Sequence, residues 1–416
     1  MSPSQPNRFA WSVLALLFAG SVVNYVDRAA LAVVKPQICE DLSISNQGYG
    51  LALNAFLVAY MILYVVGGRV ADRLGYYRTF VLTISLWSVA NMMHAAAAGL
   101  LSLCLFRALL GIGEGGFYPV ALRGSAEWFP PQVRSKAVGI YLCGLSLGAL
   151  VTPPIVAWIT LRYGWRASFL VTGALGFLLI PPWIVLHRRI RQVYGRVDPA
   201  PGLEAPSDPD MPTEEELSLG AVLRRRKYWC MLGARALSDG AWWFFLFWTP
   251  GYFQEVRHFD LAMVGRWLWM PYLGADLGAL AGGWLAAMLI HRGFGASFGR
   301  KLVLVPSGIL GALGALVYFV ENPFLALGLL SVALFGHLSW ATNVHTAVSE
   351  ISPRRHQAVL YGITGAAGTL AGALTQPLIG YVVDVAGYAP AFVCVGVVYL
   401  LAIASLVAAG RIEPLR

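Results

Sequence analysis

A glycine-rich stretch raises the question of a phosphate-binding loop. The segment RALLGIGEGGFYP begins at Arg107, and its residues Gly111, Gly113 and Gly116 have the spacing G-x-G-x-x-G. A dinucleotide-binding loop needs a β-strand before it and a helix after it, whereas the residues before Gly111 are continuously apolar and do not alternate. We therefore interpret these glycines as places where helices approach closely, with Gly111 and Gly115 at small-xxx-small spacing.

The same stretch places a carboxylate, Glu114, inside an apolar helix. Arg107 lies seven residues earlier, so the two side chains share a helix face roughly 10 Å apart along the axis. An ionisable residue at membrane depth costs at least about 2.5–3.5 kcal/mol and faces the protein interior or water. We expect a polar cavity there. Asp27 and Arg28 supply a second acid and base in the first apolar segment. Further polar positions in the second half are Arg235, Asp239 and Asp276.

Other motifs of enzyme or metal chemistry are absent or misplaced in the sequence. Gly144 to Gly148 satisfies G-x-S-x-G, but it lies in an apolar helix rather than a strand-turn-helix elbow. No H-E-x-x-H occurs, and the five cysteines have no C-x-x-C spacing. We expect no enzymatic activity, no cofactor and no metal site.

The composition is that of an integral membrane protein. Hydrophobic residues make up 58% of the 416 residues and charged residues 12%, whereas soluble domains carry about a quarter charged residues. A membrane-spanning helix needs about 20 mostly apolar residues. We predict twelve such helices: 10–34, 47–68, 79–98, 100–122, 136–159, 167–187, 229–253, 261–290, 302–320, 323–348, 357–382 and 388–410. The first has no small-residue cleavage site, so we interpret it as a retained helix.

The positive charge indicates orientation rather than nucleic-acid binding. With the amino terminus in the cytoplasm, five of the 30 Lys and Arg residues fall outside, three fall within helices, and the others are cytoplasmic. This positive-inside bias places both termini in the cytoplasm. The cluster RRRK at 224–227 then lies near lipid headgroups, and we expect no nucleic-acid partner.

A charged, proline-rich segment at 188–227 divides the predicted helices six and six. We interpret it as a cytoplasmic linker between an amino-terminal half, 1–187, and a carboxyl-terminal half, 228–416. The two halves share a sequence pattern, because a Gly-Gly pair followed by basic residues occurs at 67–80 and again at 282–302. Two related six-helix halves predict a secondary transporter with a substrate site near the bilayer midplane.

The segment GGRVADRLGYYR resembles the signature between helices two and three of the major facilitator superfamily. NYVDR at 24–28 and GIGEGGFYPVALRGSAEWFPPQVRSKAVGIY at 111–141 resemble the anion:cation symporter family within it. SDGAWWFFLFWTPGYF at 238–253 and RHFDLAMVGRWLWMPYLGADLGALAGGWL at 257–285 are most similar to bacterial hexuronate transporters. The resemblance implies an all-α membrane protein in which twelve transmembrane helices form two pseudo-symmetric six-helix halves, the major facilitator fold.

The resemblance also implies residue roles. Arg28 would grip the substrate carboxylate, and Asp27 and Glu114 would carry protons. Tyr25 and Tyr60 match the family's sugar-contacting tyrosines. Arginine suits an anionic sugar because its planar fork binds a carboxylate bidentately. The alternative is that these charges pair only to hold the bundle together.

Further candidates complete the expected site. Arg107 joins the substrate-binding set, and the second half supplies Trp242, Trp243, His337, Trp340 and Asn343 as candidate sugar contacts, with packing as the alternative for the tryptophans. We assign Asp72, Arg73, Arg78 and Arg134 to a gate. Phe117 stands where relatives often have asparagine, which leaves the identity of the sugar acid open.

The sequence and the resemblance together imply a proton-coupled symporter that imports a monovalent sugar acid, a hexuronate, by alternating access. The expected setting is a monomer in the lipid bilayer of the inner membrane, with the proton as coupling ion. Alternatives are an aldonate, an aldarate or a smaller carboxylate as cargo, and sodium as the coupling ion. A membrane sensor that binds the sugar acid without moving it is the alternative from another class.

Overall fold

The computed structural model describes residues 7–194, 218–353 and 356–413, and in these residues the chain forms helices and no strands. Ten described helical stretches are long and apolar enough to span a membrane. They match ten of the twelve predicted spans. The other two predicted spans are also helical: 47–68 lies in the first part of α3 (Asn46–Met93), and 229–253 lies in α10 (Arg226–Glu255).

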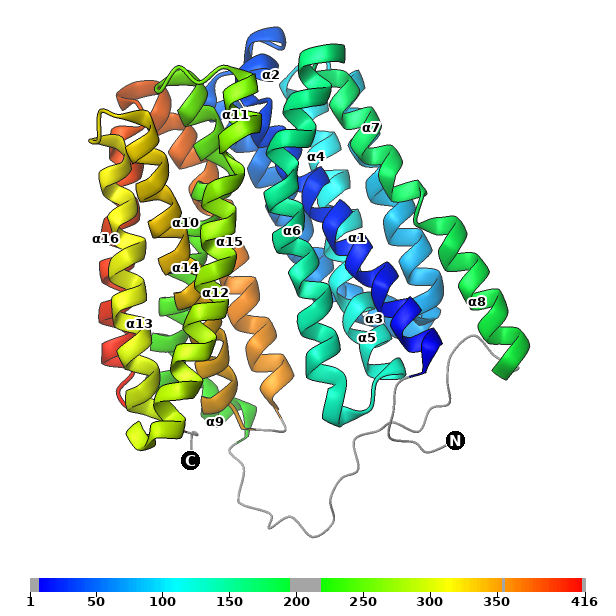
Figure 1. Ribbon diagram of the computed structural model, residues 1–416, viewed down its shortest axis with the longest axis vertical. Coiled ribbons are helices and arrows are strands. Elements are labelled where there is room, and N and C mark those ends of the chain that lie inside the picture. Colours follow the sequence, from blue (N-terminus) through cyan, green and yellow to red (C-terminus); the bar gives the residue numbers. More distant parts are fainter. Residues whose placement is uncertain (1–6, 195–217, 354–355, 414–416) are drawn as a thin grey trace. The chain divides into compact units, whose positions relative to one another are not determined.

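Contacts divide the chain into two compact units. Unit 1 comprises Met1–Ile44 and Ala55–Met211, and unit 2 comprises Ser45–Asn54 and Pro212–Arg416. Helix α3 contributes its first residues to unit 2 and its remainder to unit 1. The other helices of unit 1 are α1 (Arg8–Val33), α2 (Lys35–Asp41), η1 (His94–Ala96), α4 (Leu100–Gly115), α5 (Phe117–Trp128), α6 (Pro131–Tyr163), α7 (Trp165–Phe177) and α8 (Ile180–Tyr194) (Figure 1).

Unit 2 contains α10. Its other helices are α9 (Leu219–Leu223), α11 (Leu261–Trp267), α12 (Trp269–Leu289), η2 (Ile290–Phe294), α13 (Ala296–Ala312), η3 (Leu313–Tyr318), α14 (Pro323–Ile351), α15 (Gln357–Ala386) and α16 (Ala389–Ala408). Side-chain caps begin several helices. Asn7 accepts hydrogen bonds from Phe9 N and Ala10 N at the start of α1, and Asn322 accepts from the first turn of α14.

Helices extend into both ends of the predicted linker, 188–227. Helix α8 continues to Tyr194, so residues 188–194, which we predicted as linker, are helical. The reason is a continuing buried face, because Trp183, His187 and Ile190 are buried at helical spacing, while the neighbouring arginines are exposed. Residues 195–217 of the predicted linker lie outside the described residues, and residues 218–227 contain α9 and the start of α10.

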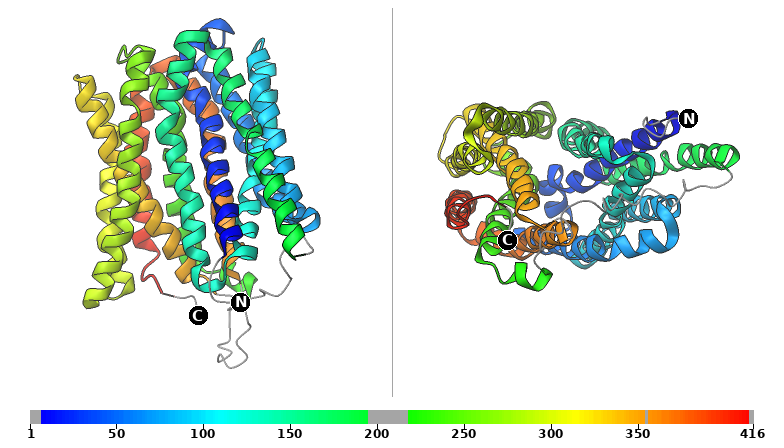
Figure 2. Two further views of the ribbon diagram at one scale, coloured as in Figure 1. Left: turned by 45° about the vertical axis from the view of Figure 1, so that its right-hand side comes forward. Right: turned by 90° about the horizontal axis from the view of Figure 1, so that it is seen from below.

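Unit 1 packs α1 along α6 through small residues (Figure 2). A Cβ atom at Gly144 would lie 2.6 Å from the carbonyl oxygen of Phe18, and one at Gly148 would lie 2.7 Å from that of Val22. The G-x-S-x-G match thus lies within a helix, as predicted, and its two glycines contact α1. At one end of unit 1, the Tyr76 hydroxyl donates to His187 Nε2 at 2.8 Å and accepts from Trp128 Nε1 at 2.7 Å.

A short ion pair joins α2 to the start of α7. Arg166 Nη1 donates to Asp41 Oδ2 at 2.5 Å, and Trp165 Nε1 donates to the same oxygen at 3.1 Å. These hydrogen bonds, chiefly that from Arg166, lower the pKa of the Asp41 carboxyl below its ordinary value of 3.8. A depressed pKa contributes stability that is present above the ordinary value and lost as the pH falls through the lowered one.

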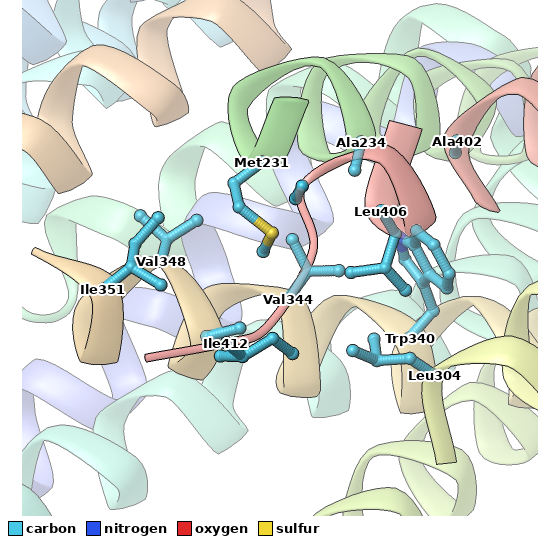
Figure 3. Packing of buried hydrophobic residues seen from close by; sticks show 12 residues of the cluster. Met231, Ala234, Leu304, Trp340, Val344, Val348, Ile351, Ala402, Leu406 and Ile412 are labelled. Atoms are coloured by element: carbon cyan, nitrogen blue, oxygen red, sulfur yellow. The ribbon is translucent and has the colours of Figure 1, made fainter. Parts of the chain in front are cut away.

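Unit 2 packs α12 against α14 through a glycine stripe. Ideal Cβ atoms at Gly274, Gly278 and Gly282 would lie 2.7, 2.0 and 2.2 Å from atoms of α14. The three glycines recur every four residues and so form one face of α12. Behind this contact, α10, α13, α14 and α16 enclose a hydrophobic cluster around Trp340, in which its indole lies beside Leu304 and Leu406 (Figure 3).

The first residues of α3 are bound to α15 and α10 within unit 2. Asp384 accepts hydrogen bonds from Asn46 N at 3.0 Å and from Gln47 N at 2.8 Å, which caps the start of α3. Asn54 Nδ2 donates to the carbonyl oxygen of Ala373 at 2.7 Å, and the Tyr49 hydroxyl donates to that of Phe247 at 2.9 Å. This segment therefore has specific partners along its whole length.

We predict that Gly278→Ala destabilises the protein. The new Cβ would meet the carbonyl oxygen of Phe335 at 2.0 Å, so α12 and α14 would have to separate. Overpacking of this kind costs about 1–3 kcal/mol. The measurement is the thermal unfolding midpoint of the purified protein in detergent. Gly283→Ala is the matched control on the same helix, because its Cβ would make an ordinary 3.7 Å contact with Thr342. Equal unfolding midpoints for the two variants would contradict the packing argument.

Candidate functional site

Helix α1 carries three buried polar side chains toward its carboxyl end. Asn24, Asp27 and Arg28 are 2%, 0% and 6% exposed. Asn24 and Arg28 lie one turn apart on the same face, and Arg28 Nη2 donates to Asn24 Oδ1 at 3.0 Å. The charged residues of the sequence motif NYVDR thus lie inside unit 1 rather than against lipid.

Arg28 forms an ion pair with Glu114 of α4. Arg28 Nε donates to Glu114 Oε2 at 2.9 Å, and the side chains are 7% and 0% exposed. The other carboxylate oxygen, Glu114 Oε1, has no hydrogen-bond partner among the described residues. Because removing one partner from a buried pair costs about 3–5 kcal/mol, each charge stabilises the other in this apolar surrounding.

Aromatic rings surround the Arg28 guanidinium. Its Cζ lies 5.2 Å from the ring centroid of Tyr25, 4.8 Å from that of Tyr60 and 5.6 Å from that of Phe56. Cation–π contacts at these distances stabilise a guanidinium without neutralising it. The structure therefore brings Tyr25 and Tyr60, the two tyrosines implied by the resemblance, to the predicted arginine.

Phe56 links this arginine to a second one. The Arg107 Cζ lies 4.5 Å from the Phe56 ring centroid, and the Arg107 side chain is fully buried. Arg107 and Glu114 are both on α4, as the seven-residue spacing predicts. The buried charged residues of α1 and α4 are therefore two arginines, Arg28 and Arg107, and two acids, Asp27 and Glu114.

The second acid, Asp27, is bonded to a different set of residues. Its Oδ1 accepts from Asn91 Nδ2 at 2.7 Å, and Asn91 Nδ2 also lies 2.8 Å from Thr172 Oγ1. Asp27 Oδ2 is buried without a hydrogen-bond partner among the described residues. An acid with one oxygen bonded and one open can accept a proton without losing its existing partner.

The glycines around Glu114 let α4 lie against α3. Ideal Cβ atoms at Gly111 and Gly115 would lie 2.4 Å from Phe56 O and 2.6 Å from Tyr60 O. This confirms the interpretation of the G-x-G-x-x-G match as helix packing. The close approach brings Phe56 and Tyr60 to the arginines.

Phe117 packs edge-on against Trp87, with ring centroids 5.2 Å apart, and is 4% exposed.

A separate aromatic and polar group lies in unit 2. The Trp242 and His337 rings stack at 5.0 Å with an interplanar angle of 10°. His337 Nδ1 lies 2.5 Å from the Tyr399 hydroxyl. Two of the five candidate sugar contacts of the second half are thus in direct contact with each other.

The other three candidates of the second half lie elsewhere in unit 2. Trp243 stacks on Phe247 at 5.4 Å and is 7% exposed. Trp340 is fully buried in the hydrophobic cluster of Figure 3, which is the packing environment that the sequence left as its alternative. Asn343 Nδ2 donates to Ser339 O at 2.9 Å, and its Oδ1 is buried without a partner among the described residues.

The candidate gate residues Asp72, Arg73 and Arg78 lie in α3 on either side of Gly75, and Arg134 lies in α6. The side chain of Asp72 lies outside the described residues, and Arg73 and Arg78 are exposed. Gly75 has a φ of 76°, which marks a break between the parts of α3. Arg134 Nη2 donates to Ala126 O at 3.1 Å, so part of its hydrogen bonding goes to the end of α5.

Several site residues were missed from the sequence. Asn24 had a signal, because it stands four residues before Arg28. Asn91 also had one, because it is an amide within an apolar span. Phe56 and Thr172 had none, since apolar residues and threonines are common in membrane helices. Among the described residues, no three His, Cys, Asp or Glu side chains gather to hold a metal ion.

Comparisons with known proteins concern the whole chain. The sequence profile described as Major Facilitator Superfamily matches residues 17–296. The chain is 32% identical to the "Hexuronate transporter" of Escherichia coli (strain K12), over 94% of this chain and 91% of that protein. It is 30% identical to the "D-galactonate transporter" of Escherichia coli O6:H1, over 96% of this chain and 95% of that protein.

A solved structure supports the fold. A bacterial homologue of the human lysosomal transporter Spinster superposes with a TM-score of 0.76, covering 97% of this chain and 95% of that chain at 18% identity. At that identity the likeness concerns the fold alone. The all-helical fold predicted from the sequence is confirmed.

Proposed function

Because the chain belongs to the Major Facilitator Superfamily and is a membrane transporter rather than an enzyme, we propose that it imports a monovalent sugar acid together with protons. The cargo that we propose is a hexuronate. Similarity to the hexuronate transporter over 94% of the chain supports this cargo. Similarity to the D-galactonate transporter makes an aldonate the second candidate.

The observation that carries the proposal is the buried Arg28–Glu114 pair. A guanidinium binds a carboxylate bidentately, and the surrounding rings of Tyr25 and Tyr60 hold it in place. The carboxylate of a sugar acid would compete with Glu114 for the same N–H groups. Protonation of Glu114 removes its negative charge and so favours the cargo.

This competition couples cargo to protons. The protonated carrier binds the anion more strongly, and the anion-loaded carrier holds the proton more strongly, because the two effects are the same free energy. Asp27 supplies a second acid within unit 1, with its Oδ2 open to a proton. We propose Asp27 and Glu114 as the proton-coupling residues and Arg28, with Arg107 nearby, as the anion-binding residues.

Unit 2 would bind the hydroxyl groups and ring of the sugar. Trp242 offers an aromatic face, while His337 and Asn343 offer hydrogen-bonding atoms. Trp243, which stacks on Phe247, is a weaker candidate for contact with the cargo. Trp340 packs within the hydrophobic cluster. Asp72, Arg73, Arg78 and Arg134 would form a gate as the site opens to each side of the membrane in turn.

We propose that the carrier works as a monomer in the inner membrane with both termini in the cytoplasm. Uptake of labelled D-glucuronate into proteoliposomes, with and without an inward proton gradient, tests the whole scheme. Competition with unlabelled aldonates and aldarates identifies the cargo, and a sodium gradient tests the other coupling ion. Binding without flux would favour a sensor and contradict the proposal.

We predict that Arg28→Lys weakens sugar-acid binding by about 10- to 100-fold, because a charged hydrogen bond contributes about 1.5–3 kcal/mol. Lysine keeps the charge but cannot present two parallel N–H groups. Binding to the purified protein can be measured by ligand-induced thermal stabilisation. Arg166→Lys, which alters the exposed pair with Asp41, is the control and should bind normally. Near-normal affinity in Arg28→Lys would rule out the role of Arg28.

We predict that Glu114→Gln uncouples transport from the proton gradient. The amide cannot ionise, so the variant should exchange labelled for unlabelled cargo but not accumulate it against a concentration gradient. Glu127→Gln, which alters the partly exposed pair with Arg123, is the control and should still accumulate cargo. Gradient-driven accumulation at the wild-type level in Glu114→Gln would show that Glu114 is structural.

A further inference from the structure

Helix α10 carries an arginine–aspartate pair that the proposed function does not use. Arg235 Nε lies 3.5 Å from Asp239 Oδ2, one helical turn away. With α10 running over Arg226–Glu255, Asp239 lies roughly 20–24 Å from its two ends. Charges at that depth of a membrane helix are costly and mark positions that face protein or water.

The Arg235 guanidinium is held by neutral groups of α15 as well as by Asp239. Its Nη1 donates to Thr364 Oγ1 at 2.7 Å and to Tyr361 O at 3.4 Å. Its Cζ lies 4.6 Å from the Tyr361 ring centroid. Removing the charge of Asp239 would therefore leave a cation that is still positioned.

Asp239 is the more accessible member of the pair. Its side chain is 20% exposed, compared with 7% for Arg235. Because a carboxylate would not face hydrocarbon, this exposed part opens to water. Trp242 lies three residues later on a neighbouring part of the same face and stacks on His337. Cargo that reaches Trp242 and His337 would consequently meet Asp239.

We propose that Asp239 determines charge selectivity by cancelling Arg235, so that the carrier accepts sugar acids with one carboxylate and rejects those with two. This inference rests on the proposed function. An aldarate would bring its second carboxylate to a neutral pair whose accessible member is itself a carboxylate, and like charges in a site of low dielectric disfavour binding. Without the charge of Asp239, the second carboxylate would find a positioned guanidinium.

The test is the selectivity of Asp239→Asn. The wild type should take up labelled D-glucuronate, with unlabelled D-galactarate, a dicarboxylate, competing poorly. In Asp239→Asn, the galactarate concentration for half-inhibition should fall about tenfold or more relative to that of unlabelled glucuronate, which corresponds to about 1.4 kcal/mol. The double variant R235Q/D239N removes both charges and should return to the selectivity of the wild type.

A second charge-neutralising variant and a binding readout keep the test decisive. Asp239→Ser removes the same charge with a smaller side chain. This matters because Asp239 Oδ2 lies only 2.1 Å from the ideal Cβ position of Gly368, so the residue has little room against α15. Thermal stabilisation by galactarate reports binding even if a variant no longer transports. Glu350→Gln, which removes an acid paired with Arg300 Nε at 2.6 Å, is the control and should keep wild-type selectivity.

The outcomes separate this inference from the proposed function. Unchanged selectivity in both folded Asp239 variants would overturn the inference, and so would a gain of galactarate binding that persists in R235Q/D239N. A wild type that neither binds nor transports any sugar acid would overturn the proposed function itself.

Discussion

The buried ion pair between Arg28 and Glu114 is the interaction on which the polar centre of unit 1 depends. Neither charge can face hydrocarbon, so each requires the other, and both require helices α1 and α4 to stay together. The neighbouring groups provide the remaining hydrogen-bonding and aromatic contacts of the Arg28 guanidinium. Asn24 accepts from a second guanidinium nitrogen, and the rings of Tyr25 and Tyr60 cover its faces. A carrier can use such a pair because its electrostatic balance changes whenever an anion or a proton arrives.

Close helix packing follows from the same constraint. Membrane helices satisfy their own backbone hydrogen bonds and gain little from hydrophobic association, so small residues allow the contacts that hold them. Gly111 and Gly115 bring α4 to α3 in unit 1, and Gly278 is at the centre of the α12–α14 contact in unit 2. In unit 1 this packing also has a chemical result, because it places Phe56 and Tyr60 against the arginines.

The class of fold and much of the charged centre could be predicted from the sequence, because apolar runs and charges within them are strong signals in a membrane protein. Ten predicted spans match helices that meet the criteria for crossing a membrane. The end of α8 was harder to place, since the amphipathic pattern continues into charged sequence. Contacts between distant helices, such as Asp27 with Asn91, depend on packing that one sequence does not encode locally. The packing environment of Trp340 shows the same limit, because an indole beside polar residues has the same sequence pattern whether it faces a ligand or a core.

The first residues of α3 have a consequence for how the chain could be divided. Ser45–Asn54 belongs to unit 2, with Asp384 capping its amino end and Asn54 bonded to Ala373. A cut in the segment between α8 and α9 would separate this stretch from its hydrogen-bonding partners, although it would leave every long helix intact. Two separately expressed fragments could then recognise each other through these hydrogen bonds. The amino-terminal fragment would hold a helix end without its capping carboxylate, and the carboxyl-terminal fragment would hold that carboxylate.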